Sequence, residues 1–184
     1  MYGLIHSALQ QMIVENYGEA KWQEVLTLAK VPEDSFFSTQ SYDDVVTFTL
    51  AQSISDVLGA PLDDCLDLFG QFWLKEFAPQ SYDMLLHAAG DSLFEFLENL
   101  NALHDRISTT FVGYVPPSFQ LQRLSDTEGI LEYRSSRDGM VPFVIGLIKG
   151  MQERFSVDIK IHEVDVIKKE PGVKALIKLE VHPR

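Results

Sequence analysis

The first 110 residues carry apolar side chains every three or four positions, the spacing of helices that bury one face. In residues 3–17, for example, Leu4, Ala8 and Met12 follow this spacing, and Gly18 comes next as a natural stop. The pattern predicts helices over residues 3–17, 21–30, 41–58, 61–77 and 91–110.

After Pro116 and Pro117 the pattern changes to alternating apolar and polar residues, which is typical of strands with one buried face. Turn-forming residues separate the strands of each pair, and an apolar helical segment over 141–155 lies between the two pairs. We therefore predict an α+β fold, with a mainly helical N-terminal part and a four-stranded antiparallel sheet that holds an inserted helix. The expected strands are residues 118–124, 129–137, 157–166 and 173–181.

Length and charge narrow the function classes. The 184 residues are the size of one domain, so we expect a single domain over 1–184. A net charge of −12 without a basic run argues against nucleic acid as a partner. We see no signal peptide and no apolar stretch long enough for membrane insertion, so we expect a cytoplasmic protein. The single Cys65 cannot form an internal disulfide or a cysteine-rich zinc site.

One histidine lies on an apolar helical face. Leu93, Leu97, Leu100, His104 and Ile107 are spaced four, three, four and three residues apart. A histidine there is either a core residue bonded to a carbonyl or a metal ligand kept neutral by its surroundings. No second ligand stands at metal spacing on this helix, and a single protein ligand suits the iron of a haem.

The stretch "ILEYRSSR" places Tyr133, Ser135 and Arg137 on one face of a predicted strand. All three side chains donate hydrogen bonds, and the guanidinium carries a fixed positive charge. The three donors form either an ordinary solvated face or a clamp for the two propionates of a haem. A single haem would need both the histidine for its iron and this face for its propionates, so the two observations support each other.

These residues resemble the haem nitric oxide/oxygen binding (H-NOX) family, found in bacteria and as the haem domain of soluble guanylate cyclase. The family pattern is a histidine, twelve residues, a proline and then Tyr-x-Ser-x-Arg. His104 and Pro117 are separated by twelve residues, and residues 133–137 fit the second motif fully. The opening Met-Tyr-Gly and the stretches 100–105 and 145–149 are also similar to cyclase-type members.

The resemblance implies a b-type haem (iron protoporphyrin IX) buried between the helical part and the sheet-containing part. His104 would be the proximal iron ligand, Tyr133, Ser135 and Arg137 would hold the propionates, and Pro117 would press on the macrocycle. The domain would consist of a helical subregion of about residues 1–60 packed on a haem-cradling subregion of about residues 61–184.

The resemblance also assigns the residues around the bound gas. Oxygen-binding members carry a distal tyrosine at the position of Phe143, and phenylalanine has no hydroxyl to stabilise O₂. Leu9 and Trp73 fall at other distal positions, and Phe77 resembles a packing residue on the proximal side. The alternative for Phe143, Leu9 and Trp73 is plain core packing.

We expect a haem-based sensor that binds NO and CO at ferrous haem, excludes O₂, and signals through the His104–iron bond to a partner protein. A histidine kinase, a cyclic-di-GMP enzyme or a guanylate cyclase would be that partner. We find no catalytic motif, so we do not expect an enzyme. The alternatives are a haem-free interaction module that binds an apolar ligand and a small hydrolase using His104 and Ser108.

Overall fold

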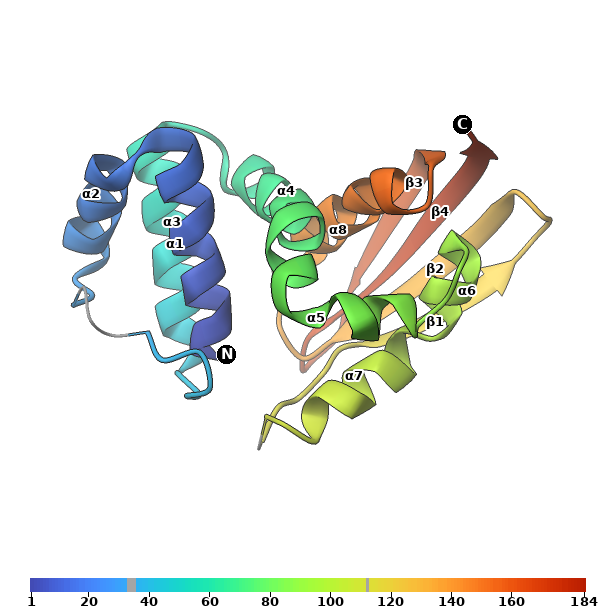
Figure 1. Ribbon diagram of the computed structural model, residues 1–184, viewed down its shortest axis with the longest axis horizontal. Helices are drawn as coiled ribbons and strands as arrows, with labels where there is room; N and C mark the ends of the chain where they lie inside the picture. Colours follow the sequence, from blue (N-terminus) through green and yellow to red (C-terminus); the bar gives the residue numbers. More distant parts are fainter. Residues whose placement is uncertain (33–35, 112) are drawn as a thin grey trace.

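The computed structural model describes residues 1–32, 36–111 and 113–184. The predicted α+β class is confirmed: helices come first, and a four-stranded antiparallel sheet with one inserted helix follows (Figure 1). The helices are α1 Gly3–Tyr17, α2 Glu19–Ala29, α3 Asp44–Leu58, α4 Leu62–Phe72, η1 Trp73–Phe77, α5 Ala78–His87, α6 Leu93–Glu98, α7 Leu100–Ser108 and α8 Val141–Arg154. The strands are β1 Ser118–Arg123, β2 Glu128–Ser135, β3 Val157–Lys168 and β4 Val173–Pro183.

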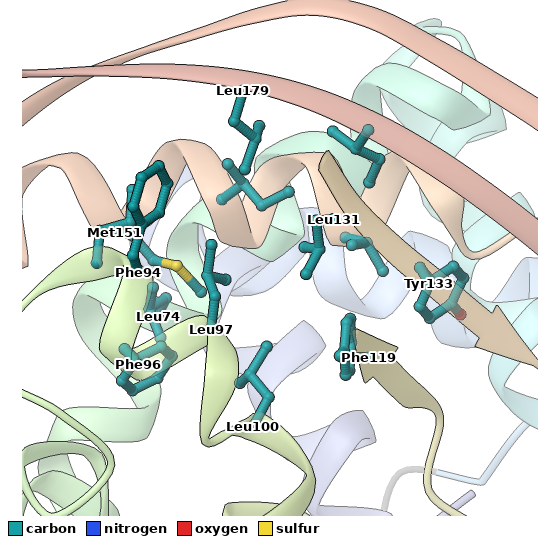
Figure 2. Close-up of a cluster of buried hydrophobic side chains, with 14 of the residues drawn as sticks. Leu74, Phe94, Phe96, Leu97, Leu100, Phe119, Leu131, Tyr133, Met151 and Leu179 are labelled. Atoms are coloured by element: carbon teal, nitrogen blue, oxygen red, sulfur yellow. The ribbon is translucent and has the colours of Figure 1, made fainter. Parts of the chain in front are cut away.

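The sheet has the strand order β1-β2-β4-β3, and every neighbouring pair is antiparallel. Its apolar face is strictly alternating: Leu131 and Tyr133 of β2 pair with Ile177 and Ala175 of β4, and all four are at most 2% exposed. Figure 2 shows Leu131, Tyr133 and Leu179 in one cluster with side chains of α6 and α8. The predicted alternation therefore places the sheet face against the helices.

The helical region differs from the prediction in two places. The helix expected over 61–77 continues through a wider π-helical turn, η1, into α5, which the sequence pattern did not reveal. Pro79 stands in the first turn of α5, where a missing backbone N–H does little harm. The helix expected over 91–110 is divided at Asn99, whose side chain donates to the carbonyl of Ala89 at 2.9 Å.

Two hydrophobic clusters fill the interior. One, the helical cluster, is built mainly from α1 to α4 and includes Leu9, Trp22 and Phe69. The other, the sheet cluster, joins the sheet to the helices from Leu74 onward. Among the described residues, Trp73 is the half-buried side chain that packs against both clusters, so η1 lies where they meet.

Helices α4 and α8 touch through their backbones. A Cβ atom on Gly70 would lie 2.2 Å from the carbonyl oxygen of Phe143, and one on Gly146 would lie 2.0 Å from that of Asp67. Only glycine allows this approach, because any Cβ would overlap the facing backbone. An ion pair between Lys149 and Asp67 joins the same two helices.

No single helix in the described part of the chain is long and apolar enough to cross a membrane. The helical segments Asp44–Leu58 and Leu62–His87 would reach the required length and apolar composition only if counted together, and they are bent by 109° relative to each other.

Candidate functional site

His104 projects from α7 toward the sheet. Its ring stacks on Phe119 of β1, with centroids 5.7 Å apart and planes at 21°, and Tyr114 lies 6.4 Å from it. Phe119 is paired across the sheet with Tyr133, and both rings are labelled in Figure 2. One aromatic ring therefore separates His104 from Tyr133, the first of the three predicted hydrogen-bond donors. His104 and Tyr133 thus both contact Phe119, and their shared role as haem-binding residues stays a prediction.

Burial lowers the pKa of His104 to about 4, so its imidazole is neutral at physiological pH, although the nearby carboxylate of Asp105 acts in the opposite direction. The Nδ1 atom is buried, and no described residue forms a hydrogen bond with it. A core histidine normally satisfies its buried ring nitrogen, for instance with a carbonyl. A neutral, unpaired imidazole on an apolar wall therefore fits a residue that binds a metal or cofactor.

Of the three predicted donors, Tyr133 and Ser135 lie on β2, whereas Arg137 lies just beyond the end of this strand, which was expected to run to residue 137. Tyr133 is buried and Ser135 and Arg137 are half-buried, whereas Arg134 and Ser136 between them are exposed. The backbone N–H of Arg137 donates to Ser135 Oγ at 3.0 Å. Burial raises the pKa of Tyr133, although its hydrogen bond with Ser135 and the charge of Arg137 act in the opposite direction. The face thus offers a protonated phenol, a hydroxyl and a cation.

The guanidinium of Arg137 is held from two sides. Its Nε donates to Asp44 at the start of α3 at 2.7 Å, and another nitrogen donates to the carbonyl of Val115 at 3.0 Å. Asp44 also binds the N-terminal ammonium of Met1 at 2.6 Å. Burial alone would raise the pKa of Asp44, but the hydrogen bonds from the ammonium and Arg137 hold it below its usual range. Two cations therefore meet one carboxylate beside the donor face.

Two of the predicted gas-side residues, Phe143 and Trp73, belong to a chain of aromatic rings beside the helical cluster. Phe143 of α8 lies 5.2 Å from Phe69 of α4, Phe69 lies 6.1 Å from Trp73, and Trp73 lies 5.1 Å from Phe77. Leu9 of α1 is buried in the same cluster. The structure thus brings these residues together from three helices and the π-helical turn.

The roles assigned to all of these residues stay predictions, and two of the residues have still to be placed in the fold. Phe77, expected on the side of His104, lies beside Trp73 and packs against the helical cluster. Pro117 stands half-buried in the segment between α7 and β1, two residues after Val115, whose carbonyl binds Arg137.

Sequence reasoning did not single out Asp44, Phe69, Tyr114 or Phe119. Asp44 carried only the signal of an acid in the first turn of a helix, which is common. Phe119 became visible as a neighbour of His104 only through the register that pairs it with Tyr133.

A family model described as "Haem-NO-binding" matches residues 2–163. The chain belongs to the haem-NO-binding family. The resemblance drawn from the His104, Pro117 and Tyr-x-Ser-x-Arg motifs is therefore confirmed, and the cofactor of this family is the predicted haem. The family supplies a sensor domain rather than a catalytic one.

Curated members of the family match most of this chain. Soluble guanylate cyclase 89Da of Drosophila melanogaster is 28% identical over 166 residues, which are 90% of this chain and 25% of that protein. Soluble guanylate cyclase gcy-31 of Caenorhabditis elegans is 32% identical over 167 residues, which are 90% of this chain and 24% of that protein. The chain thus spans about a quarter of the length of these relatives.

Solved structures of family members share the fold. An H-NOX protein from S. oneidensis in the Fe(II)NO ligation state aligns with a TM-score of 0.84 and 23% identity, covering 99% of both chains. The I5F mutant of T. tengcongensis H-NOX aligns with a TM-score of 0.86 and 20% identity, covering 100% of this chain and 99% of that one.

Proposed function

We propose that this chain holds a ferrous haem through His104 and senses NO, and also CO, while discriminating against O₂. The observation that carries the proposal is the neutral His104 imidazole, with its unpaired buried nitrogen, next to the donor face of β2. In a domain of the haem-NO-binding family, these residues would supply an iron ligand and an anion clamp. The bound haem would supply an iron centre that takes a diatomic gas.

In this proposal Tyr133, Ser135 and Arg137 hold the propionates, because together they offer two neutral donors and one cation at one end of β2. Pro117 would lie against the macrocycle. The haem would be buried between a helical subregion of about residues 1–60 and a cradle of about residues 61–184. The position of Trp73 between the two hydrophobic clusters supports this arrangement.

Gas selectivity would come from side chains that cannot donate a hydrogen bond. Bound O₂ carries partial negative charge and needs a donor in a dry pocket, whereas NO and CO bind ferrous haem without one. Phe143, Phe69 and Leu9 have no donor group. The indole N–H of Trp73 is the donor that the predicted gas side still offers.

Signalling would run from His104 through α7. Asn101 fixes this helix to β1, because its Nδ2 donates to the Phe119 carbonyl at 2.7 Å and its Oδ1 accepts from the Phe119 N–H at 2.9 Å. A displacement of His104 is therefore passed to the edge of the sheet. A partner protein responds to this change only if it binds the gas-free and the gas-bound states with different free energies.

The output would lie in a partner signalling protein or another region of a longer chain. The relatives named soluble guanylate cyclases favour a cyclase region, and a histidine kinase or a cyclic-di-GMP enzyme would suit a separate partner. A cytoplasmic setting is part of the same proposal.

The test is the absorption spectrum of the reduced protein under argon, after NO, after CO and in air. We expect a haem Soret band that shifts with NO and with CO and stays unliganded in air. In His104→Gly with added imidazole, haem should still bind, but the NO-dependent output of a coupled partner should be lost. Absence of a Soret band after haem addition would instead favour the haem-free module.

A further inference from the structure

A groove of about 220 Å³ lies between the C-terminal end of α5 and α7, the helix that carries His104. Its floor is formed by the buried residues Ala89 and Leu103, and its rim includes the small, exposed Ala88 and Ala102. The hydrogen bond from Asn99 to the Ala89 carbonyl ties the start of α7 to the end of α5. The groove is therefore part of the fold and lined mainly by small or apolar side chains.

Arg106 lines this groove and has no ion pair among the described residues. The other five arginines of the chain are all paired with acids: Arg123 with Glu98, Arg134 with Glu132, Arg137 with Asp44, Arg154 with Asp83 and Arg184 with Asp158. In a chain with a net charge of −12, one uncompensated guanidinium beside a groove is an exception.

An acid on the facing helix and the acid next to Arg106 in the chain are otherwise engaged or directed elsewhere. Asp83 of α5 binds Arg154 at 3.0 Å and lies 3.3 Å from His87. Asp105 precedes Arg106 directly, and neighbouring positions of a helix do not face each other. The positive charge in the groove thus stays available to a group from outside.

We propose that the groove receives a carboxylate side chain from an acidic segment of a partner protein, and that Arg106 binds it. A planar guanidinium pairs with a carboxylate through two parallel hydrogen bonds, and the alanines on the rim leave room for the approach. Met84 is 87% exposed and lies on the same face of α5 as Ala88, four residues away. It offers a protein segment the apolar contact that a free small anion could not use.

This surface deepens the proposed function, because the groove and His104 share α7. A movement of α7 relative to α5 changes the distance between Arg106 and the facing end of α5. The link between gas and partner rests on the proposed function, whereas binding in the groove does not.

The probe is a short, blocked, fluorescein-labelled helical peptide with one glutamate between leucine and alanine, compared with the same peptide carrying glutamine. Fluorescence anisotropy is measured with the reduced, haem-loaded protein at low salt. We expect saturable binding of the glutamate peptide, and binding of the glutamine peptide weaker by about tenfold or more. Equal binding of the two peptides, or no saturable binding of the first, overturns the proposal.

Two matched variants locate the site. Ala102→Glu places a carboxylate four residues before Arg106, where it pairs with the guanidinium across one helical turn and occupies the groove. We expect it to weaken binding of the glutamate peptide about tenfold more than Ala102→Gln does, because glutamine fills the same space without a charge to pair with Arg106. Unchanged binding by Ala102→Glu overturns the proposal.

The absorption spectra separate this inference from the proposed function. If the protein shows normal ferrous and NO spectra but does not bind the glutamate peptide, only the groove proposal fails. If the protein takes up no haem but binds the glutamate peptide, and Ala102→Glu weakens this binding, only the proposed gas sensing fails.

Discussion

The Nε atom of Arg137 lies 2.7 Å from Oδ2 of Asp44, which joins the end of β2 to the start of α3 across 93 positions of sequence. The arginine side chain is 20% exposed and the aspartate 37% exposed, so water screens this pair only in part. Because the same arginine belongs to the predicted propionate clamp, the ion pair connects that clamp with the helical part of the molecule.

Asp44→Asn keeps the shape of the side chain but removes its charge. We expect the free energy of unfolding at neutral pH to fall by about 1 kcal/mol, since a partly exposed ion pair contributes little more. Urea denaturation measures this change. Asp165→Asn, at an exposed acid of β3, serves as control and should leave stability unchanged. The pKa of Asp44 is held low in the folded state, so the difference should be present above about pH 4 and vanish as the pH falls further.

His6 gives the helical cluster a sensitivity to acid. It is fully buried, its Nε2 lies 2.7 Å from Thr47 Oγ1, and burial together with the N-terminal charge lowers its pKa to about 4. The unfolded chain takes up this proton near pH 6.5, so stability should decline between pH 6.5 and pH 4 by about 2–3 kcal/mol from this residue. His6→Gln should flatten that part of the pH profile in thermal unfolding. His87→Gln, at an exposed position, should leave the slope intact, and equal slopes in both variants would contradict the assignment.

Phe143→Tyr introduces a hydroxyl among the rings of the predicted gas side. If Phe143 faces the bound gas, the reduced variant should form an oxygen complex that persists in air, because the new donor stabilises the partial negative charge on O₂. The absorption spectrum before and after exposure to air is the measurement. Phe155→Tyr is the matched control, since Phe155 packs on Phe96 in the sheet cluster. A Phe143→Tyr protein that stays unliganded in air would show that this side chain points elsewhere.

The backbone contact between α4 and α8 should tolerate no side chain. Gly146→Ala would bring Cβ to 2.0 Å from the carbonyl oxygen of Asp67, so the helices must separate at a cost of about 2–3 kcal/mol. Gly150→Ala is the graded control, because its Cβ would meet its nearest neighbours only at 3.3 Å. Thermal unfolding should show a clear loss for the first variant and a small change for the second.

The parts of the fold that depend on local pattern were predictable from the sequence. The alternation over residues 129–137 predicted a strand with one buried face, because a strand presents alternate side chains to opposite sides, and Leu131 and Tyr133 lie on that face. The features that were missed depend on distant contacts. The division of a helix at Asn99 is stabilised by a bond to Ala89, and the π-helical turn at Trp73 lies where two clusters meet.

In the candidate site, too, local features were predictable from the sequence and contacts between distant segments were not. His104 and the Tyr-x-Ser-x-Arg stretch were identified from residue type and spacing, and the structure brings them near each other. The partner of Arg137 could not be found in this way. Asp44 and Arg137 meet only because α3 and the end of β2 fold together, and no local signal distinguishes Asp44 from its neighbour Asp43.

The pair of hydrogen bonds between Asn101 and the backbone of Phe119 restricts how α7 can respond to a pull on His104. Sliding along the strand would break both bonds together, whereas turning about Asn101 preserves them. In the proposed signalling, the helix would act as a lever with a fixed pivot. A small shift at position 104, less than one turn from that pivot, would be amplified toward the far end of the helix at Ser108.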